Sequence, residues 1–432
     1  MSDTPRLVFR GAKLLDGLSR SRKDTSVVVE AERISRVAPD AAVESRPEDR
    51  VVEVAGRTLM PGMFSCHFHS SWEGLSPISA PATGLHAPPA YMALTAGKNA
   101  RVALEHGITG VIGSSVGYGI DASLKQAIED GLVPGPRMLA GSHELCSTGD
   151  LPTGSQVNWH MQLGNLGVVR RGDGPVAFQR LVREEIKQGA DVVKLSATRG
   201  HGAGATEPSL ALTVVEIEAA ARAAHQRGKR LRAHAVSKEG ILACARAGVD
   251  LIDHADQLDD ECIEAILERD LTIVPSAMYV VRTLQLFDEG MMQAFLPDPI
   301  PPIFEETIRT MRSDLENSAV FLPRAVRAGV RIASGDDYGT AYLLHGEYAK
   351  EHAYYVDEVG IDALEVLRWA TLAGAEAMGR GDELGSIEVG KLADLLVVDG
   401  DPVSDIACLQ DPERIAIVLK GGNFEKGGTA EA

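Results

Sequence analysis

Short apolar runs, broken by glycine, aspartate and proline, open this chain and return at its end. Alternating segments of this length, bounded by turn residues, are typical of β-strands. The expected strands are 6–10, 26–30, 33–37 and 51–54 near the start, and 393–399 and 414–422 near the end. Each group is too small to bury a core alone, so we expect residues 1–60 and 385–432 to build one β-sandwich domain together.

Between these ends, over residues 61–384, apolar runs of strand length alternate with segments of helical periodicity. This alternation is typical of parallel βα units. One expected strand leads into His67 and His69, and the others are 109–112, 137–140, 191–195, 230–234, 251–254, 271–274 and 330–334. About eight such strands predict an α/β fold, a TIM-type (β/α)8 barrel that carries the smaller β-sandwich domain.

Two stretches are longer than ordinary connections. Residues 145–175 are rich in glycine, asparagine and glutamine around Trp159 and His160, and residues 279–304 hold methionine and aromatic side chains with four prolines. Long loops in a compact domain are usually functional or disordered. The second stretch is apolar enough to cover a pocket as a lid, and a contact between subunits is the alternative interpretation.

Composition narrows the functional classes. The chain has 432 residues, 44% of them hydrophobic, and a formal net charge of -18, which argues against a nucleic-acid or anionic-membrane binder. The N-terminus lacks the apolar core of a signal peptide and no run of 18 apolar residues follows, so we expect a cytoplasmic protein. Five scattered cysteines, never in a Cys-x-x-Cys pair, disfavour a disulfide framework and a thiolate zinc site.

The strongest sign of chemistry is the tripeptide His67-Phe68-His69. On an extended segment the two imidazoles point the same way and can reach one metal ion, although a short motif of this kind also occurs on solvated loops. Functional residues of such a barrel lie where its strands end. Those positions hold only side chains that can bind metal, namely His67, His69, Lys194, His234, His254 and Asp336. One such histidine alone would more often be a core residue, but the whole set predicts a metal centre.

Lys194 is the least expected member of this set, because a buried lysine is costly and metal ions repel an ammonium group. Burial and nearby cations lower the pKa of a lysine, and the neutral amine can react with carbon dioxide to give an anionic carbamate. A carbamate offers one oxygen to each of two metal ions. A salt bridge in the barrel interior is the alternative interpretation of Lys194 taken alone.

Several motifs together resemble the amidohydrolase superfamily of binuclear metal hydrolases. They are PGMFSCHFH (61–69), GADVVK (189–194), RAHA (232–235), IDHA (252–255), SGD (334–336) and SIEVGKLADL (386–395). The pattern is similar to the zinc-dependent, prolidase-like branch related to imidazolonepropionase. That branch also includes ochratoxin-degrading amidases and hydrolases of carbamate and phenylurea herbicides. The resemblance covers nearly the whole chain.

The resemblance implies two divalent metal ions, expected to be zinc, with cobalt, manganese and iron as alternatives. The implied ligands are His67, His69 and Asp336 for one ion, His234 and His254 for the other, and the Lys194 carbamate with a hydroxide between them. Asp336 would accept the proton of the attacking hydroxide and deliver it to the leaving amine. Its neighbour Asp337 is expected to support a metal ligand from behind or to be a loop residue, because only one carboxylate at a strand end needs to face the barrel axis.

The expected substrates are small molecules, namely dipeptides or N-acyl amino acids with a free carboxylate. His143 is expected to donate a hydrogen bond to the oxyanion. Arg199 or His201 would anchor the carboxylate, or else lie on a solvated loop, and Tyr279 and His345 would line the pocket. Residues 148–151 and 196–201 depart from the family pattern, which concerns the pocket more than the chemistry.

Two other functions stay open from the sequence. One is a hydrolase of carbamates, ureas or aryl amides, including ochratoxin-like amides, if the second long stretch is a lid. The other is a catalytically silent barrel scaffold, which would be expected to have lost a metal ligand, whereas this chain fills every ligand position. Assembly into a homo-oligomer is expected by resemblance only.

Overall fold

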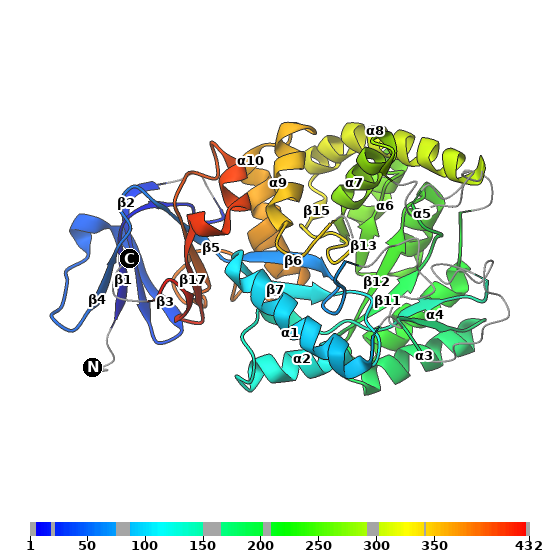
Figure 1. Cartoon of the computed structure of the whole chain (residues 1–432), viewed down its shortest axis with the longest axis horizontal. Helices are drawn as coiled ribbons and strands as arrows, with labels where there is room; N and C mark the ends of the chain where they lie inside the picture. Colours follow the sequence, from blue (N-terminus) through cyan, green and yellow to red (C-terminus); the bar gives the residue numbers. More distant parts are fainter. Residues whose placement is uncertain are drawn as a thin grey trace.

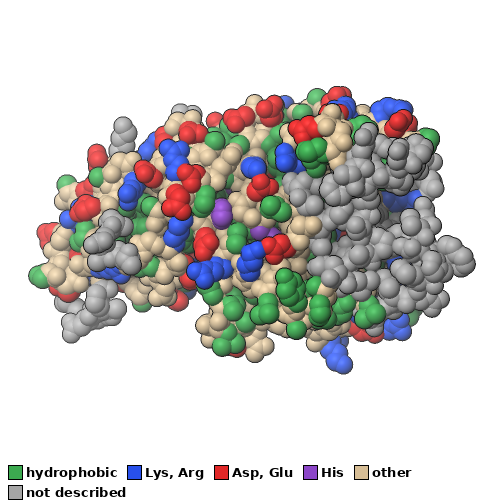
Figure 2. Space-filling model, in the orientation of Figure 1, with side chains coloured by type: hydrophobic (Ala, Val, Ile, Leu, Met, Phe, Trp, Pro, Cys, Tyr) green, Lys and Arg blue, Asp and Glu red, His purple; other side chains and the backbone are tan. Residues whose placement is uncertain are grey.

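The computed structural model describes residues 6–18, 22–74, 87–149, 166–201, 209–291, 302–340 and 343–428. Figure 1 shows two parts side by side: a β-sheet that contains both ends of the described chain, and a larger part in which helices surround parallel strands. The surface in Figure 2 mixes acidic and basic side chains over most of the described face. None of the helices in the described segments has the length and apolar character needed to cross a membrane.

The smaller part is one eight-stranded sheet, in the order β18-β17-β16-β5-β1-β2-β3, with β4 paired to β1. Its strands are β1 (Leu7–Leu14), β2 (Arg22–Glu30), β3 (Arg33–Pro39), β4 (Arg50–Glu53), β5 (Thr58–Pro61), β16 (Leu395–Val398), β17 (Ile415–Lys420) and β18 (Asn423–Lys426). β16 lies between β17 and β5, so strands from both ends share one sheet. The alternating side chains of β1 explain its two buried faces: Phe9 packs in one apolar cluster and Val8 in another.

Within the described residues, the larger part contains ten parallel strands in two hydrogen-bonded sheets. One has the order β6-β7-β8 and the other β10-β9-β11-β12-β13-β14-β15. The strands are β6 (Met63–Phe68), β7 (Ile108–Gly113), β8 (Arg137–Leu139), β9 (Glu144–Cys146), β10 (Val169–Arg171), β11 (Val192–Ser196), β12 (Arg230–Ala235), β13 (Leu251–His254), β14 (Thr272–Val274) and β15 (Arg331–Ile332). All eight expected strands are present, while β9 and β10 are short strands that the sequence pattern did not predict.

Backbone hydrogen bonds connect the two parallel sheets at two places, from β8 to the start of β11 and from β6 to the end of β15. Beyond β8, the carbonyl of Ala140 accepts from the N–H groups of Asp191 and Val192, at 2.8 and 3.1 Å. At the opposite edge, the N–H of Cys66 in β6 donates to the carbonyl of Ser334, just after β15, at 2.7 Å. The strand ends of both sheets are thereby held next to one another.

The helices pack apolar faces against these strands. They are α1 (Pro89–Glu105), α2 (Ile120–Glu129), α3 (Pro175–Lys187), α4 (Val214–His225), α5 (Lys238–Ala247), α6 (Asp260–Glu268), α7 (Ala277–Asp288), α8 (Pro302–Ala328), α9 (Tyr348–Asp357), α10 (Ala363–Arg368) and α11 (Gly374–Ala377), with a π-helical turn at Trp369–Ala373. A capping box of Thr213 and Glu216 begins α4, and Gly248 at a φ of 80° ends α5.

Part of the second long stretch is helical, so the prediction of a loop over 279–304 was wrong at both ends. Helix α7 covers Ala277–Asp288 and α8 starts at Pro302. The reason is apolar spacing: Val280 and Leu284, one turn apart, pack with Ile308 of α8 in a buried cluster. Residues 292–301 of this stretch, and Trp159 and His160 of the first one, lie outside the described residues.

Candidate metal centre

The histidine pair on β6 has the geometry that strand alternation predicts. The rings of His67 and His69 lie 4.9 Å apart and both are buried. Their Nε2 atoms lie 3.1 and 2.9 Å from the same oxygen, Oδ1 of Asp337. The indole of Trp72 stacks on the His69 ring, with 3.7 Å between the ring centroids. The two imidazoles therefore converge on one point, as a chelating pair must.

His234 and His254, at the ends of β12 and β13, lie close to the histidine pair of β6. Their rings lie 4.5 Å apart, and the His254 ring lies 5.4 Å from that of His67. His254 has a φ of 75° and Ala255 a φ of 55°, in the left-handed region that non-glycine residues rarely adopt. Such backbone costs on the order of 1–3 kcal/mol and is often found at functional sites. Here it ends β13 at the residue that presents its ring to the cluster.

Burial favours the neutral form of three of these imidazoles, the form in which histidine binds a metal ion. Burial lowers the pKa of His67 and of His234 to about 4. Burial, with the neighbouring His201 and His234, holds the pKa of His254 well below its ordinary value. Nδ1 of His254 is buried without a hydrogen-bond partner in the described structure, and Nε2 of His67 has beside it the Asp337 carboxylate. An unpartnered lone pair of this kind is what a divalent ion such as zinc binds.

Ligand atoms from His67, His254 and Asp337 all lie within 4.8 Å of one another. Two imidazoles and one carboxylate form a donor set typical of zinc and related divalent ions. The residues of this cluster thus fit a metal ion.

The two adjacent aspartates have the reverse of their predicted positions. Asp337 faces the histidines, and although its burial acts to raise the pKa of its carboxyl, the His67 and His69 rings outweigh that effect and hold it well below its ordinary range. Asp336 instead accepts hydrogen bonds from the N–H groups of Met278 and Tyr279, at 2.7 and 3.2 Å, in the first turn of α7. Asp336 was predicted to be the metal ligand, but its carboxyl faces α7 and not the histidines, so this prediction was wrong. The carboxylate that faces the histidines belongs to Asp337.

The environment of Asp336 explains why it is not a ligand. Its carboxyl also accepts a hydrogen bond from the N–H of Asp337, at 2.8 Å, so its oxygens bind backbone rather than the cluster. Burial and the nearby carboxyls of Glu351 and Asp337 hold the pKa of Asp336 well above its ordinary value. Asp336 thus ties the strand end to the start of α7.

Lys194, on β11, forms the interior salt bridge that the sequence left open as an alternative. Its Nζ lies 2.5 Å from Oδ2 of Asp253, and its side chain is only 3% exposed. The guanidinium of Arg232 pairs with the same carboxylate. Burial acts to raise the pKa of Asp253, but the charges of Arg232 and Lys194 outweigh it, so that pKa lies well below its ordinary range. Asp253 is part of the IDHA motif, but its role depends on contacts with two neighbouring strands and could not be inferred from the motif.

His143 is not free to act as the predicted oxyanion donor. Its Nδ1 lies 2.9 Å from Oε2 of Glu185, and its Nε2 accepts from the N–H of Tyr118 at 3.3 Å. Glu185 is held in turn by Arg170, 2.7 Å away. Both ring nitrogens of His143 therefore bind protein, and this part of the prediction was wrong.

Of the four predicted substrate contacts, three lie beside the histidine cluster and one, His345, lies behind it. His201 and Tyr279 lie beside the cluster: their rings stack with 5.1 Å between centroids, and the His201 ring lies 4.4 Å from that of His254. Arg199 contributes its carbonyl, 3.0 Å from Nε2 of His234. His345 lies behind the site, with its Nε2 3.2 Å from the carbonyl of His69, and burial lowers its pKa to about 3.

His201 differs from the neutral histidines because it has a carboxylate partner. Its Nδ1 lies 2.7 Å from Oδ2 of Asp256. Burial acts to lower the pKa of His201, but Asp256 outweighs it, and the pKa lies above its ordinary value.

Backbone and hydroxyl groups orient the candidate ligands. Nδ1 of His67 lies 3.0 Å from Oγ of Ser276, whose own hydroxyl donates to the carbonyl of Gly335 at 2.9 Å. Nδ1 of His69 lies 3.2 Å from the carbonyl of Ser115. A ring that donates from Nδ1 to these partners keeps the lone pair of Nε2 for a metal ion. No residue motif could have singled out Ser276, which is brought to His67 by the fold.

We therefore expect Ser276→Ala to lower the affinity for metal by about 10- to 100-fold, the usual effect of losing such a supporting hydrogen bond. Competition with a chelator measures this affinity. The matched control is Ser26→Ala, since Ser26 is a buried serine of the terminal sheet that bonds to Asp40. Equal metal affinity in both variants would contradict the assigned role of Ser276.

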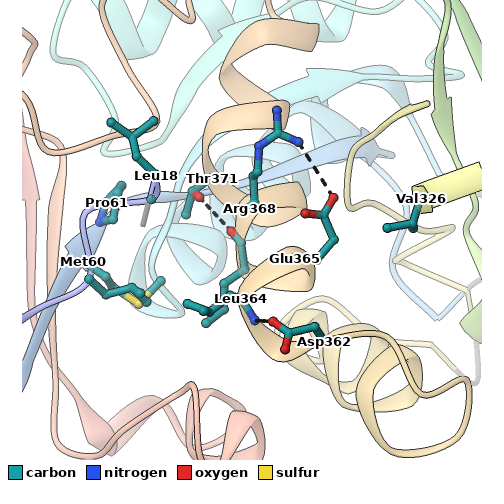
Figure 3. A pocket seen from close by; sticks show the side chains of 12 residues that line it. Leu18, Met60, Pro61, Val326, Asp362, Leu364, Glu365, Arg368 and Thr371 are labelled. Carbon is teal, nitrogen blue, oxygen red and sulfur yellow. Dashed lines mark hydrogen bonds and ion pairs between the residues drawn. The ribbon is translucent and has the colours of Figure 1, made fainter. Parts of the chain in front are cut away.

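A separate cavity of about 390 Å³ lies between the end of β5 and helix α10 (Figure 3). Met60, Pro61, Leu364 and Arg368 are among the side chains around it. None of the candidate site residues lines it, so it is not part of the metal centre.

Comparison with known proteins identifies the family. The Amidohydrolase family model matches residues 58–424. Ochratoxinase from Aspergillus niger is 27% identical over 389 residues, which cover 85% of this chain and 76% of that protein. The crystal structure of a Xaa-Pro dipeptidase with bound methionine in the active site has a TM-score of 0.82 and 27% identity, covering 98% of this chain and 100% of that one. The crystal structure of A. niger ochratoxinase, with a TM-score of 0.81 and 23% identity, covers 99% of this chain and 96% of that one and shares its fold. The chain therefore belongs to the amidohydrolase family, as its motifs predicted, and is a hydrolase that acts on carbon–nitrogen bonds.

Proposed function

We propose that this protein is a metal-dependent hydrolase of amide bonds in dipeptides or N-acyl amino acids. The observation that carries the proposal is the convergence of the buried rings of His67, His69 and His254 and the carboxylate of Asp337 at the ends of parallel strands. We further infer that the two parallel sheets form one closed (β/α)8 barrel, supported by the backbone hydrogen bonds between β8 and the start of β11 and between β6 and the residue after β15. In that fold, catalytic residues lie at the carboxyl ends of the strands.

The residues that would hold two divalent ions are His67, His69, Asp337, His234, His254 and a carbamate on Lys194. When bound, such ions lower the pKa of water and polarise the substrate carbonyl. For Lys194 to become a carbamate, its amine must lose a proton and release Asp253, which keeps Arg232 as a partner. The Arg232 pairing thus supports an arrangement in which Asp253 stays compensated after Lys194 reacts.

Asp337 is the group placed to move the proton. Its Oδ1 lies where the histidine pair converges, and the contacts with His67 and His69 hold the pKa of its carboxyl well below its ordinary range, which favours the carboxylate form. After accepting the proton of the attacking water, its carboxyl can donate that proton to the amine that leaves. Asp336 cannot replace it, because its oxygens bind the start of α7.

The relatives support the choice of substrate. One similar structure is described as a Xaa-Pro dipeptidase with methionine in its active site, and a similar sequence is an ochratoxinase. For this chain, dipeptides and N-acyl amino acids are therefore the first substrates to examine.

The test is incubation of metal-loaded protein with a pooled library of dipeptides, N-acyl amino acids, carbamates and phenylureas, read by mass spectrometry. The protein with Asp337→Asn serves as the blank. We expect free amino acids to be released by the wild-type protein alone. Cleavage confined to carbamates or ureas would contradict the proposed substrate class, and no difference from the blank would contradict the proposed function.

A further inference from the structure

Trp72 covers one face of the His69 ring. The centroids of the indole and the imidazole lie 3.7 Å apart and their planes differ by 9°, so the two rings are stacked almost in parallel. The same imidazole is held at two points of its edge, since Nδ1 lies 3.2 Å from the carbonyl of Ser115 and Nε2 lies 2.9 Å from Oδ1 of Asp337. The indole therefore restrains the tilt of the ring, which contacts at two points of its edge leave free.

A tight turn after β6 brings the indole back over His69. The N–H of Trp72 donates to the carbonyl of His69 at 3.1 Å, the hydrogen bond that closes a β-turn. The buried side-chain amide of Asn99, on α1, donates to the carbonyls of Ser70 and Trp72, at 2.9 Å each. The backbone of this turn is thus fixed from both sides, so the stack follows from the fold of the chain.

Gly339 packs against the backbone of Trp72. It has a φ of 107°, and a Cβ at this position would lie 2.6 Å from Cβ of Trp72 and 2.7 Å from its carbonyl oxygen. Only a glycine allows so close an approach. Because Gly339 follows Asp337 by two residues, this contact connects the segment that carries the carboxylate to the turn that carries the indole.

Stacking and packing hold the indole in place, without a hydrogen bond from its nitrogen. Nε1 of Trp72 is buried and has no hydrogen-bond partner in the described structure. The face of an indole is negative and attracts an electron-poor partner. A bound cation draws electron density out of an imidazole, so the stack on His69 should be stronger in the metal-bound protein than in the metal-free one.

We infer that Trp72 is a positioning residue of the metal centre. Its indole holds the His69 ring with Nε2 toward the ion, and it stabilises that ring more strongly once the ion is bound. The inference rests on the metal centre of the proposed function, and it does not require that an amide is hydrolysed. Of the two expected ions it concerns the one that His69 would bind, so Trp72 should affect one of the two binding steps.

The test is titration of zinc into metal-free protein in bicarbonate buffer, with the affinity of each binding step measured by competition with a chelator. Trp72→Leu removes the stack. We expect it to weaken one binding step about 10-fold and to leave the other within about threefold of wild type. Trp72→Phe keeps an aromatic face on His69 and should restore the affinity to within about threefold of wild type. Thermal unfolding of the metal-free proteins shows whether each variant is folded.

Tryptophan fluorescence gives a second measurement. Zinc should change the emission of the wild-type protein, because the ion alters the ring that the indole contacts, and Trp72→Phe should remove most of this change. The matched control is Trp369→Phe, the same substitution at a buried tryptophan that packs on Tyr355 and donates to Glu365. We expect this control to keep the change in emission.

Equal zinc affinities in wild type and Trp72→Leu, or an equal loss at both binding steps, would overturn the inference. So would a change confined to KM, because Trp72 would then act as a wall of the substrate pocket. If Trp72→Leu does not fold, fluorescence decides: a change in emission that survives Trp72→Phe, or that is lost equally in Trp369→Phe, overturns the inference.

Failure of the proposed function looks different. In that case zinc binding depends on Trp72, yet the same protein hydrolyses no amide in the substrate library. Hydrolysis by a protein whose zinc affinity does not depend on Trp72 would overturn the inference alone, and wild-type protein that binds no zinc would overturn both.

Discussion

Asp337→Asn is expected to reduce kcat by about 10³-fold, within the range that a positioned acid–base group contributes. The reason is the position of its Oδ1, 2.9 Å from Nε2 of His69 and 3.1 Å from Nε2 of His67. An amide in its place can neither accept nor deliver a proton. Steady-state kinetics on the best library substrate, with metal content measured on the same sample, checks this result.

Asp336→Asn is the matched control, because it makes the same chemical change at the adjacent residue. We expect kcat to stay within about tenfold of wild type, since a neutral group at this buried position keeps a hydrogen-bond acceptor for the first turn of α7. Stability should fall by about 1–3 kcal/mol, because an asparagine cannot accept from all three backbone N–H groups. If Asp336→Asn were inactive and Asp337→Asn active, the assignment would be reversed.

Lys194→Ala is expected to lose both bound metal and activity. It removes the amine that would carry the carbamate, and it leaves the fully buried Asp253 with Arg232 alone. In the protein without carbamate this variant also removes one of the two partners of a buried carboxylate, so a lower midpoint of thermal unfolding is expected relative to metal-free wild type. Mass spectrometry of the metals and thermal unfolding measure the two effects.

A conservative variant separates the metal from the salt bridge. Lys194→Arg keeps a positive charge next to Asp253 but cannot form the carbamate, so stability should recover relative to Lys194→Ala while metal binding does not. Protein equilibrated with ¹³C-bicarbonate should show a carbamate carbon signal that is absent from Lys194→Ala. Retention of two metal ions by either variant would refute the bridging carbamate and support the salt bridge as the sole role of Lys194.

The sequence predicted the strands and the histidines because both depend on local regularities. Side-chain alternation puts His67 and His69 on one side of β6, and an apolar run that ends in histidine predicts both β13 and the position of His254. The division at residues 60/61 and 384/385 is a prediction that the shared sheet does not define by itself. The family, by contrast, could be inferred from several motifs in order, and the family model confirms it.

What the sequence could not predict depends on contacts between distant segments. Which of two adjacent aspartates faces the histidines is decided by the start of α7, whose N–H groups hold Asp336. Likewise, the ring of His143 forms a hydrogen bond with Glu185, 42 residues away, and the carboxylate of Asp253 forms an ion pair with Arg232 on the neighbouring strand. Spacing along the chain carries no information on these pairs, so only the folded structure separates ligands from supporting residues.

The central claim is that hydrolysis depends on metal held by this cluster, and titration of metal into the metal-free protein tests it most directly. Metal-free protein is prepared with a chelator, shown by circular dichroism to remain folded, and returned stepwise to zinc while the hydrolysis of the best library substrate is followed. We predict no hydrolysis without metal, and a rate that rises until two ions are bound per chain. Full activity in folded, metal-free protein would contradict the account.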